Sequence, residues 1–437
     1  MPERMMLRRV LLPAGVEGAV LPLLAGKALR AFVDGYVAVL LPSYLLALGY
    51  GTLDVGILST ATLLGSALAT LAVGTWGHRV HHRHLLLGAA LLMLATGLSF
   101  AYFSTFWPLL LVAFVGTLNP SSGDVSLFLP LEHARLADSG QGTARTAVFA
   151  RYSLLGALFA ALGALCSGVP EWLAAQGFGL LDAFRAMFVL YGFIGGVVWL
   201  LYRRLPVPPR ELGAGAPMPL GESRRTVIRL AALFSVDSFA GGLTINALMT
   251  LWFLQRFGLS LAVAGQFFFW AGLLSALSQL IAPRVAQRIG LVNTMVFTHI
   301  PASLCLIAAA FVPDVGWALG LLFLRALLSQ MDVPARSAFV MEVVTPGERA
   351  AAASFTAVPR SLAAAVSPSI GGALLAAGWL AAPLVVCGGL KIAYDLALWK
   401  AFRLHLTPGQ VPSNSSAGLV GAPSKASSDE ALDKGRQ

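Results

Sequence analysis

Apolar residues recur along this chain in runs long enough to cross a lipid bilayer, which takes about 20 residues in a helix. A polar stretch rich in proline and glycine, 203–227, separates the sixth run from the seventh. The pattern predicts an all-α membrane protein with twelve transmembrane helices in two six-helix halves, 28–202 and 228–403, joined by a cytoplasmic linker. The twelve predicted spans are roughly 28–48, 55–76, 84–103, 107–130, 147–168, 182–202, 228–254, 261–282, 291–312, 316–336, 350–377 and 381–401.

The two ends of the chain differ from the spans. The stretch 10–26 follows three arginines and resembles the apolar part of a signal peptide, but it is short and contains Pro13, Glu17 and Pro22. We expect residues 1–27 to be an uncleaved cytoplasmic segment at the membrane surface, with a signal peptide as the alternative. The tail 404–437 is rich in Ser, Gly, Pro and charge, and it is expected to be disordered in the cytoplasm.

Composition agrees with the pattern. Apolar residues make up 57% of the 437 residues and charged residues 11%, whereas soluble domains have about 45–50% and about 25%. These values exclude most soluble enzymes, disordered proteins and fibrous proteins. The three cysteines lie far apart in apolar runs, so neither a disulfide framework nor a cysteine metal site is predicted.

The net charge of +10 reflects membrane topology. The Lys and Arg residues of the termini and of the loops after spans 2, 4, 6, 8 and 10 fall on one side, and the loops of the other side hold one, Arg256. Positive residues stay on the cytoplasmic side. Both termini are therefore predicted to be cytoplasmic, in an inner or plasma membrane, and the basic charge does not indicate nucleic-acid binding.

The two halves repeat one another. A shift of 209 residues superposes three glycine pairs and two arginine pairs, and arginine is scarce in these spans. Parallel six-helix repeats of this kind build transporters whose halves rock about a central site. The matching pairs are Gly49 with Gly258, Gly56 with Gly265, Arg79 with Arg288, Arg151 with Arg360 and Gly163 with Gly372.

The loops after spans 2 and 8 are similar to the signature G-x-L-A-D-R-x-G-R-R/K of the major facilitator superfamily. The residues that carry the signature positions are Gly74, His78, Arg79 and Arg83 in the first loop and Arg288 and Gly290 in the second. A histidine and a glutamine stand where the family has its aspartates. The resemblance implies a twelve-helix transporter in which helices 1, 4, 7 and 10 line a central cavity.

Charged and polar residues inside the spans are the candidates for function, because a charge in hydrocarbon is costly. Asp34 and Asp237, in spans 1 and 7, are proton-coupling candidates, since a carboxylate can bind and release a proton as access alternates. Arg30, one turn before Asp34, could instead form a local ion pair with it. Arg325, midway along span 10, is the best-placed cavity cation, for substrate contact or a buried pair.

Other residues complete the candidate sites. Asn119 and Asn246 are further cavity candidates. Lys391 and Asp395, spaced i, i+4, are expected to pair on a peripheral helix. Four charged residues are expected to pair with one another as a cytoplasmic gate: Asp124, Arg151, Asp332 and Arg360.

These observations predict secondary transport of a small solute by alternating access, first of all proton-coupled efflux of a drug-like or amphipathic compound. An organic-anion permease is the alternative, and a non-transporting membrane sensor or assembly factor is the alternative of another class. The histidines of the first signature loop lack Cys, Asp or Glu neighbours, so no metal is predicted, and no cofactor is expected. Nucleotide-binding and hydrolase motifs are absent, so neither a pump driven by ATP nor an enzyme is predicted. The partners expected are the solute, protons and the lipid bilayer, for a monomer.

The topology gives the first testable prediction. A reporter enzyme that is active only outside the cytoplasm, fused to the C-terminus, should stay inactive in cells, because the positive residues hold that end in the cytoplasm. The same reporter inserted beside Arg256 should be active. An active C-terminal fusion would contradict the predicted orientation.

Overall fold

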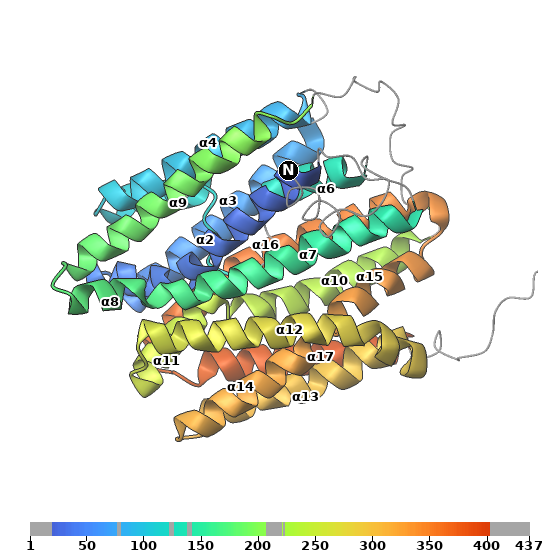
Figure 1. Cartoon of the computed structure of the whole chain (residues 1–437). Helices are drawn as coiled ribbons and strands as arrows, with labels where there is room; N and C mark the ends of the chain where they lie inside the picture. Colours follow the sequence, from blue (N-terminus) through green and yellow to red (C-terminus); the bar gives the residue numbers. More distant parts are fainter. Residues whose placement is uncertain are drawn as a thin grey trace, which may run out of the picture.

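The computed structural model describes residues 20–76, 80–121, 126–137, 142–206, 221 and 223–402, and every element in these ranges is a helix (Figure 1). The first half contains α2 (Val20–Ala47), α3 (Thr52–Trp76), α4 (His82–Tyr102), α5 (Phe106–Val115), α6 (Phe128–Ala137), α7 (Gly142–Leu165), the 3-10 helix η2 (Cys166–Gly168), α8 (Val169–Ala175) and α9 (Leu180–Tyr202). The second half contains α10 (Arg224–Gly242), α11 (Asn246–Phe257), α12 (Leu261–Ile289), α13 (Leu291–Phe311), α14 (Val315–Ser329), α15 (Asp332–Val343), the 3-10 helix η3 (Pro346–Glu348), α16 (Arg349–Ala376) and α17 (Ala382–Phe402).

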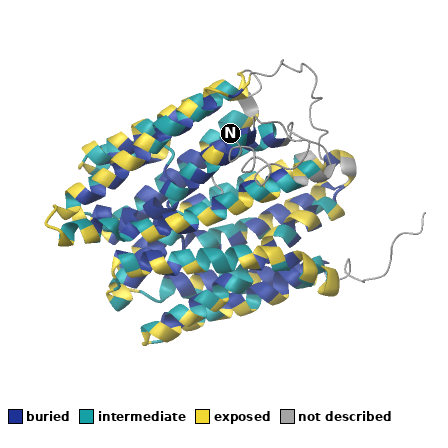
Figure 2. Ribbon diagram, viewed as in Figure 1, coloured by how far each residue is buried: buried dark blue, intermediate teal, exposed yellow. Residues whose placement is uncertain are grey.

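These helices account for the twelve predicted spans. Ten helical segments in the described ranges are long and apolar enough to cross a membrane. The fourth span is divided between α5 and α6, and the eleventh is α16, which is 28 residues long but less apolar. Large apolar side chains such as Trp107, Phe193 and Phe297 are more than half exposed on the outer faces, as expected where the surroundings are lipid (Figure 2).

The first helix begins earlier than predicted. Helix α2 starts at Val20, so residues 20–27 belong to the same helix as the first predicted span. Pro22 is compatible with this start, because the first turn of a helix needs no N–H donor. Gly26 packs against the Tyr202 ring of α9, which fixes the start of α2 inside the first half.

Three of the four predicted cavity helices are broken near their middles. Span 4 unwinds between α5 and α6, span 7 between α10 and α11, and span 10 between α14 and α15. The residues at the breaks explain them: Pro120 cannot continue a helix, Gly242 follows a second glycine, and Pro334 restarts a helix in its first turn. The first break is also held by Asn119, whose side chain accepts hydrogen bonds from the Ser121 backbone and hydroxyl.

We call the end of the bundle where α2 begins and α17 ends the termini side, and the opposite end the far side. One buried apolar cluster occupies the far-side half of the bundle and contains residues of both halves, such as Tyr44 with Trp252. Toward the termini side this core divides into two separate clusters. One contains only first-half residues, such as Phe128, and the other only second-half residues, such as Phe339. The halves are therefore in contact on the far side.

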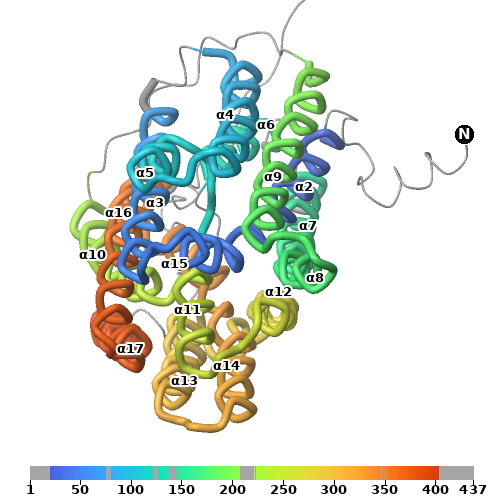
Figure 3. Tube along the Cα trace, turned by 90° about the vertical axis from the view of Figure 1, so that its left-hand side faces the viewer, coloured from blue at the N-terminus to red at the C-terminus, as the bar shows by residue number. Residues whose placement is uncertain are grey.

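The most extensive direct contacts between the halves lie between α3 and α16 and between α7 and α12. In Figure 3 α3 lies beside α16. Helices α4 and α9 lie toward one edge of the bundle, and α13 and α14 lie toward the opposite edge. A Cβ at Gly56 would come within 2.6 Å of the Pro368 carbonyl oxygen, and one at Gly265 within 2.3 Å of the Ala164 carbonyl oxygen. Only glycine allows these approaches. Gly49 and Gly258 are also alike, with φ of 90° and 62° at the ends of α2 and α11.

Candidate functional site

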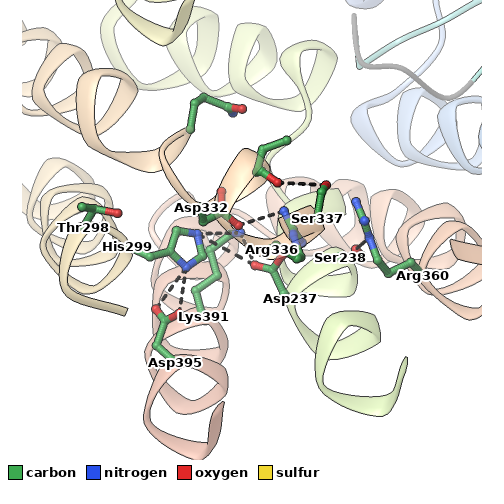
Figure 4. Close-up of polar contacts among 12 residues, drawn as sticks. Asp237, Ser238, Thr298, His299, Asp332, Arg336, Ser337, Arg360, Lys391 and Asp395 are labelled. Carbon is green, nitrogen blue, oxygen red and sulfur yellow. Dashed lines mark hydrogen bonds and ion pairs between the residues drawn. The ribbon is translucent and has the colours of Figure 1, made fainter. Parts of the chain in front are cut away.

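Asp237 of α10 lies at the centre of a buried group of charged side chains in the second half (Figure 4). Its Oδ1 atom accepts a hydrogen bond from Lys391 Nζ of α17 at 2.7 Å, and its Oδ2 atom accepts one from Arg336 Nη1 of α15 at 3.0 Å. The carboxylate is 5% exposed. No basic residue lies one turn away from it in sequence, so its partners come from other helices.

Four more contacts extend this group, which we call the C-half cluster: Asp237, His299, Asp332, Arg336, Lys391 and Asp395. Arg336 Nη2 lies 2.8 Å from Asp332 Oδ2, one turn earlier on α15. His299 Nδ1 of α13 lies 3.0 Å from Asp395 Oδ2, and its Nε2 atom lies 3.4 Å from Lys391 Nζ. The Nε2 atom is also 3.9 Å from Asp237 Oδ1. The cluster thus joins α10, α13, α15 and α17.

Lys391 and Asp395 do not form the expected pair. Both lie on the inner face of α17, where Lys391 bonds Asp237 and Asp395 bonds His299. Asp395 is fully buried. The expectation of a peripheral pair was wrong, because spacing along one helix identifies neighbours but not the stronger partners that other helices supply.

The cluster brings charges of both signs together. Three carboxylates lie among a guanidinium, an ammonium and an imidazole. The two imidazole nitrogens have different neighbours, because Nδ1 of His299 lies beside Asp395 and its Nε2 lies beside Lys391. His299 thus connects the Asp395 carboxylate to the group around Asp237.

The first half contains its own buried ion pair. Arg30 Nη2 of α2 lies 2.6 and 2.5 Å from the two carboxylate oxygens of Glu132 on α6. The hydroxyls of Tyr152 and Tyr202 also donate to Glu132, which is fully buried. The guanidinium of Arg30 lies over the Phe128 ring, 3.9 Å from its centroid. Arg30 thus uses Glu132 as its main partner, rather than only its helical neighbour Asp34.

Asp34 lines a small pocket with Lys27, Arg30, Ser126 and Tyr152. The pocket brings α2 beside the second part of span 4, at the depth of the Arg30–Glu132 pair. Its two cations and its carboxylate make it the polar region of the first half. The role of Asp34 in proton coupling stays a prediction.

The three predicted gate residues in the described ranges, Arg151, Asp332 and Arg360, have different neighbours. Asp332 bonds Arg336, and Arg360 Nε of α16 donates to Ser238 Oγ at 3.0 Å. The Nη1 atom of Arg151 on α7 is buried without a hydrogen-bond partner in the described part of the chain. Asp124 lies outside the described residues. Asp332 thus belongs to the C-half cluster and Arg360 lies beside it, and a gating role for the four residues stays a prediction.

The cavity candidates Asn119 and Asn246 lie at two neighbouring breaks. The N–H of Ala247, next to Asn246, donates to the Pro120 carbonyl, next to Asn119, at 3.2 Å. This hydrogen bond joins span 4 of the first half to span 7 of the second. The two asparagines are thus brought to the junction between the halves, where a substrate cavity is predicted.

Arg325 of α14 has a different environment. It is half-buried, and Cys305 on α13 and Cys387 on α17 are among the residues near it. It forms no ion pair or hydrogen bond within the ranges that the structure describes. Its guanidinium is therefore a cation at mid-membrane without an anionic partner in this state.

The signature-loop residues lie on the termini side. Gly74 is exposed near the end of α3, and His78 and Arg79 are outside the described residues. Arg83 Nη2 donates to the Arg203 carbonyl at 2.6 Å, which ties the start of α4 to the end of α9. Arg288 lies in the last turn of α12, and Gly290, with φ of 86°, forms the tight link from α12 to α13.

Sequence reasoning missed three members of these clusters, which are Glu132, His299 and Arg336. The sequence does contain an indication of the role of Arg336, because this residue follows Asp332 by four residues and so lies on the same helix face. Glu132 matches Glu342 at a shift of 210 residues, but this gives no partner. His299 stands alone in an apolar run, and its partner is 96 residues away.

The fold and the buried charges define a transporter built from two six-helix halves. Residues 23–331 match the Major Facilitator Superfamily, and the chain belongs to this family of secondary transporters. It is 25% identical over 344 residues to the uncharacterized membrane protein YJR124C of Saccharomyces cerevisiae, covering 69% of this chain and 76% of the relative.

Solved structures agree with this fold. The nucleoside transporter NupG is 13% identical with a TM-score of 0.67, covering 89% of this chain and all of the other. A bacterial homolog of the human lysosomal transporter Spinster, in an inward-facing and occupied conformation, is 16% identical with a TM-score of 0.68, covering 90% and 98%. The human organic anion transporter MFSD10 is 18% identical with a TM-score of 0.59, covering 87% and 98%.

The Arg30–Glu132 pair gives a stability prediction. Replacing Arg30 by Ala leaves a carboxylate buried without its cation, which should lower the free energy of unfolding in micelles by about 3–5 kcal/mol. Arg30→Met combined with Glu132→Gln should restore most of the loss. Arg185→Ala removes an exposed pair with Asp182, and it should cost about 0–1 kcal/mol. Equal effects of Arg30→Ala and Arg185→Ala would contradict the prediction.

Proposed function

We propose that this member of the family exports a small amphipathic solute from the cytoplasm in exchange for protons, and that Asp237 carries the coupling. The observation that supports this most is the sharing of one buried carboxylate by Lys391 and Arg336. These two cations come from different helices, so the charge state of Asp237 affects how α10, α15 and α17 are held together. The family match favours transport over a sensor or assembly role.

The chemistry follows from the charges. In this proposal Asp237 is ionised while both cations contact it, because nearby positive charges favour the charged form of a carboxylate. A proton can bind once Lys391 or Arg336 has moved away, and binding it removes the attraction that would bring the cation back. Proton occupancy and helix position therefore depend on each other, which is what coupled transport requires.

Asp34 is the second candidate for a proton site. It lies in the polar pocket of the first half, beside Lys27 and Arg30. A site in each half would let one half bind a proton while the other responds to substrate. The amphipathic substrate class is supported by the apolar and aromatic composition of the spans, and the named neighbours, which handle nucleosides and organic anions, do not narrow it further.

The coupling prediction uses proteoliposomes with an imposed pH gradient and ethidium as the amphipathic probe. Asp237→Asn should abolish gradient-driven accumulation, because a neutral amide cannot cycle a proton. Exchange of labelled for unlabelled ethidium should persist, because exchange needs only alternating access. Both activities are measured as probe flux, from about pH 5 to about pH 8.

The matched control is Asp314→Asn, which changes an exposed carboxylate that caps α14 on the far side. This variant should accumulate the probe like the wild type. Asp34→Asn tests the second site in the same assay. Normal accumulation by both Asp237→Asn and Asp34→Asn over the whole pH range would contradict proton coupling through either residue.

A second candidate function is transport of an organic anion. Arg325 favours it, because this half-buried cation at mid-membrane has no anionic partner in the described part of the chain. An anionic group of a substrate would supply one. The cost of leaving the charge unpaired would then be removed when the substrate binds.

Fluorescein uptake tests this alternative. If the substrate is anionic, Arg325→Ala should raise the KM for fluorescein by about 10- to 100-fold. This is the loss of affinity expected when one hydrogen bond to a charged group is removed. Arg325→Lys, which keeps the charge, should lose less. Ethidium flux should not change in either variant. An Arg325→Ala protein that transports fluorescein like the wild type would exclude this role.

A further inference from the structure

The carboxylate of Glu171 bridges the two halves on the far side. Glu171 belongs to α8, in the first half, and α12 is the second span of the other half. Its Oε1 atom accepts a hydrogen bond from Leu261 N at 2.8 Å, and its Oε2 atom accepts one from Ala262 N at 3.2 Å. Both donors are backbone groups in the first turn of α12.

These hydrogen bonds complete the N-terminus of α12. The first N–H groups of a helix have no partner within the helix, and the positive end of the helix dipole favours a negative charge there. Ser260, the residue before α12, caps only the N–H of Val263, at 3.3 Å. Glu171 accepts the hydrogen bonds of the N–H groups of Leu261 and Ala262. Most of the capping of α12 therefore comes from the opposite half.

The two halves are also closely packed next to Glu171. Ser167 Oγ donates to the Leu261 carbonyl at 3.2 Å, and Ser167 is fully buried. A Cβ at Gly168 would lie 2.8 Å from the Ala262 Cβ. The two halves can therefore separate here only by breaking the Glu171 and Ser167 hydrogen bonds together.

We propose that Glu171 is a positioning residue for transport, a latch that holds the far side closed by capping α12 across the interface. It does not contact the substrate. Opening of the cavity toward the far side requires that both oxygens leave the α12 amides, and closing restores them. The proposal depends on the two-half architecture and not on the substrate or the coupling ion.

Glu348 supplies a matched comparison on the termini side. Its carboxylate accepts hydrogen bonds from the backbone N–H groups of Gly221 and Ser223, at the start of α10. Hydrogen bonds from the Ser223 side chain and from these N–H groups lower the pKa of Glu348. Glu348 caps a helix end within its own half, so its contacts need not break when the halves move.

The test measures how often the far-side interface opens. Ser167→Cys places a thiol in this buried position, in full-length protein that lacks Cys166, Cys305 and Cys387 and is held in nanodiscs. The rate of alkylation by a charged maleimide then reports the fraction of molecules in which the halves have separated. A loss of overall stability would raise the rate in any destabilised variant, whereas loss of the latch should raise it only for Glu171.

In this background Glu171→Ala should raise the alkylation rate about 5- to 30-fold, the effect of losing a helix cap on a two-state equilibrium. Glu171→Gln, which keeps one acceptor oxygen and loses the charge, should raise it less, and it serves as the test if the alanine variant does not fold. Glu348→Ala should leave the rate unchanged. A wild-type rate in the Glu171 variants, or an equal increase in Glu348→Ala, would overturn the proposal.

Discussion

A charge inside the bilayer must find its partner within the protein, and this constraint organises each half of the molecule. Arg30 and Glu132 tie the first span to the second part of the fourth, and Asp237 ties α10 to α15 and α17. Within a half the helices are thus joined by buried ion pairs. Between the halves the contacts are close backbone approaches at small residues and hydrogen bonds to backbone groups, such as Ala247 to Pro120 and the α12 amides to Glu171. The buried ion pairs described above therefore lie inside the halves, and hydrogen bonds and close packing lie where the halves must separate.

The internal repeat describes the interface better than it describes the charged sites. Gly56 and Gly265 are equivalent in the sequence, and each permits a backbone contact with the opposite half. The buried pairs do not follow this symmetry. The first helix of the first half supplies a cation to a carboxylate on its fourth helix, whereas in the second half the first helix supplies the carboxylate Asp237 and the fourth helix the cation Arg336. The repeat thus duplicates the glycine contacts between the halves but not the buried ion pairs, which His299 joins in the second half.

The spans, their number and the repeat could be predicted from the sequence because hydropathy and spacing are local properties. The breaks in spans 4, 7 and 10 could not, although Pro120, Gly242 and Pro334 mark them, because hydropathy averaged over about 20 residues does not register where the backbone leaves the helix. The C-half cluster could be predicted even less well from the sequence. Asp237 was identified as a buried carboxylate, but its partners Lys391 and Arg336 are 154 and 99 residues away. Spacing along one helix predicted Lys391 with Asp395 instead, and tertiary packing overrode it.

Two adjacent residues connect the charged cluster to the interface. Asp237 bonds the cations of α15 and α17, while Ser238, the next residue, accepts a hydrogen bond from Arg360 of α16. Helix α16 in turn meets the first half, where the N–H of Ser369 donates to Thr60 of α3 at 2.9 Å. Five residues after Asp237, α10 ends at a break, and α11 beyond it contacts the first half through Ala247. In the proposed coupling, a change in charge at Asp237 that moves α10 would act on these two connections, through α16 and through α11. The proposed proton site would then bias which side of the bundle is closed.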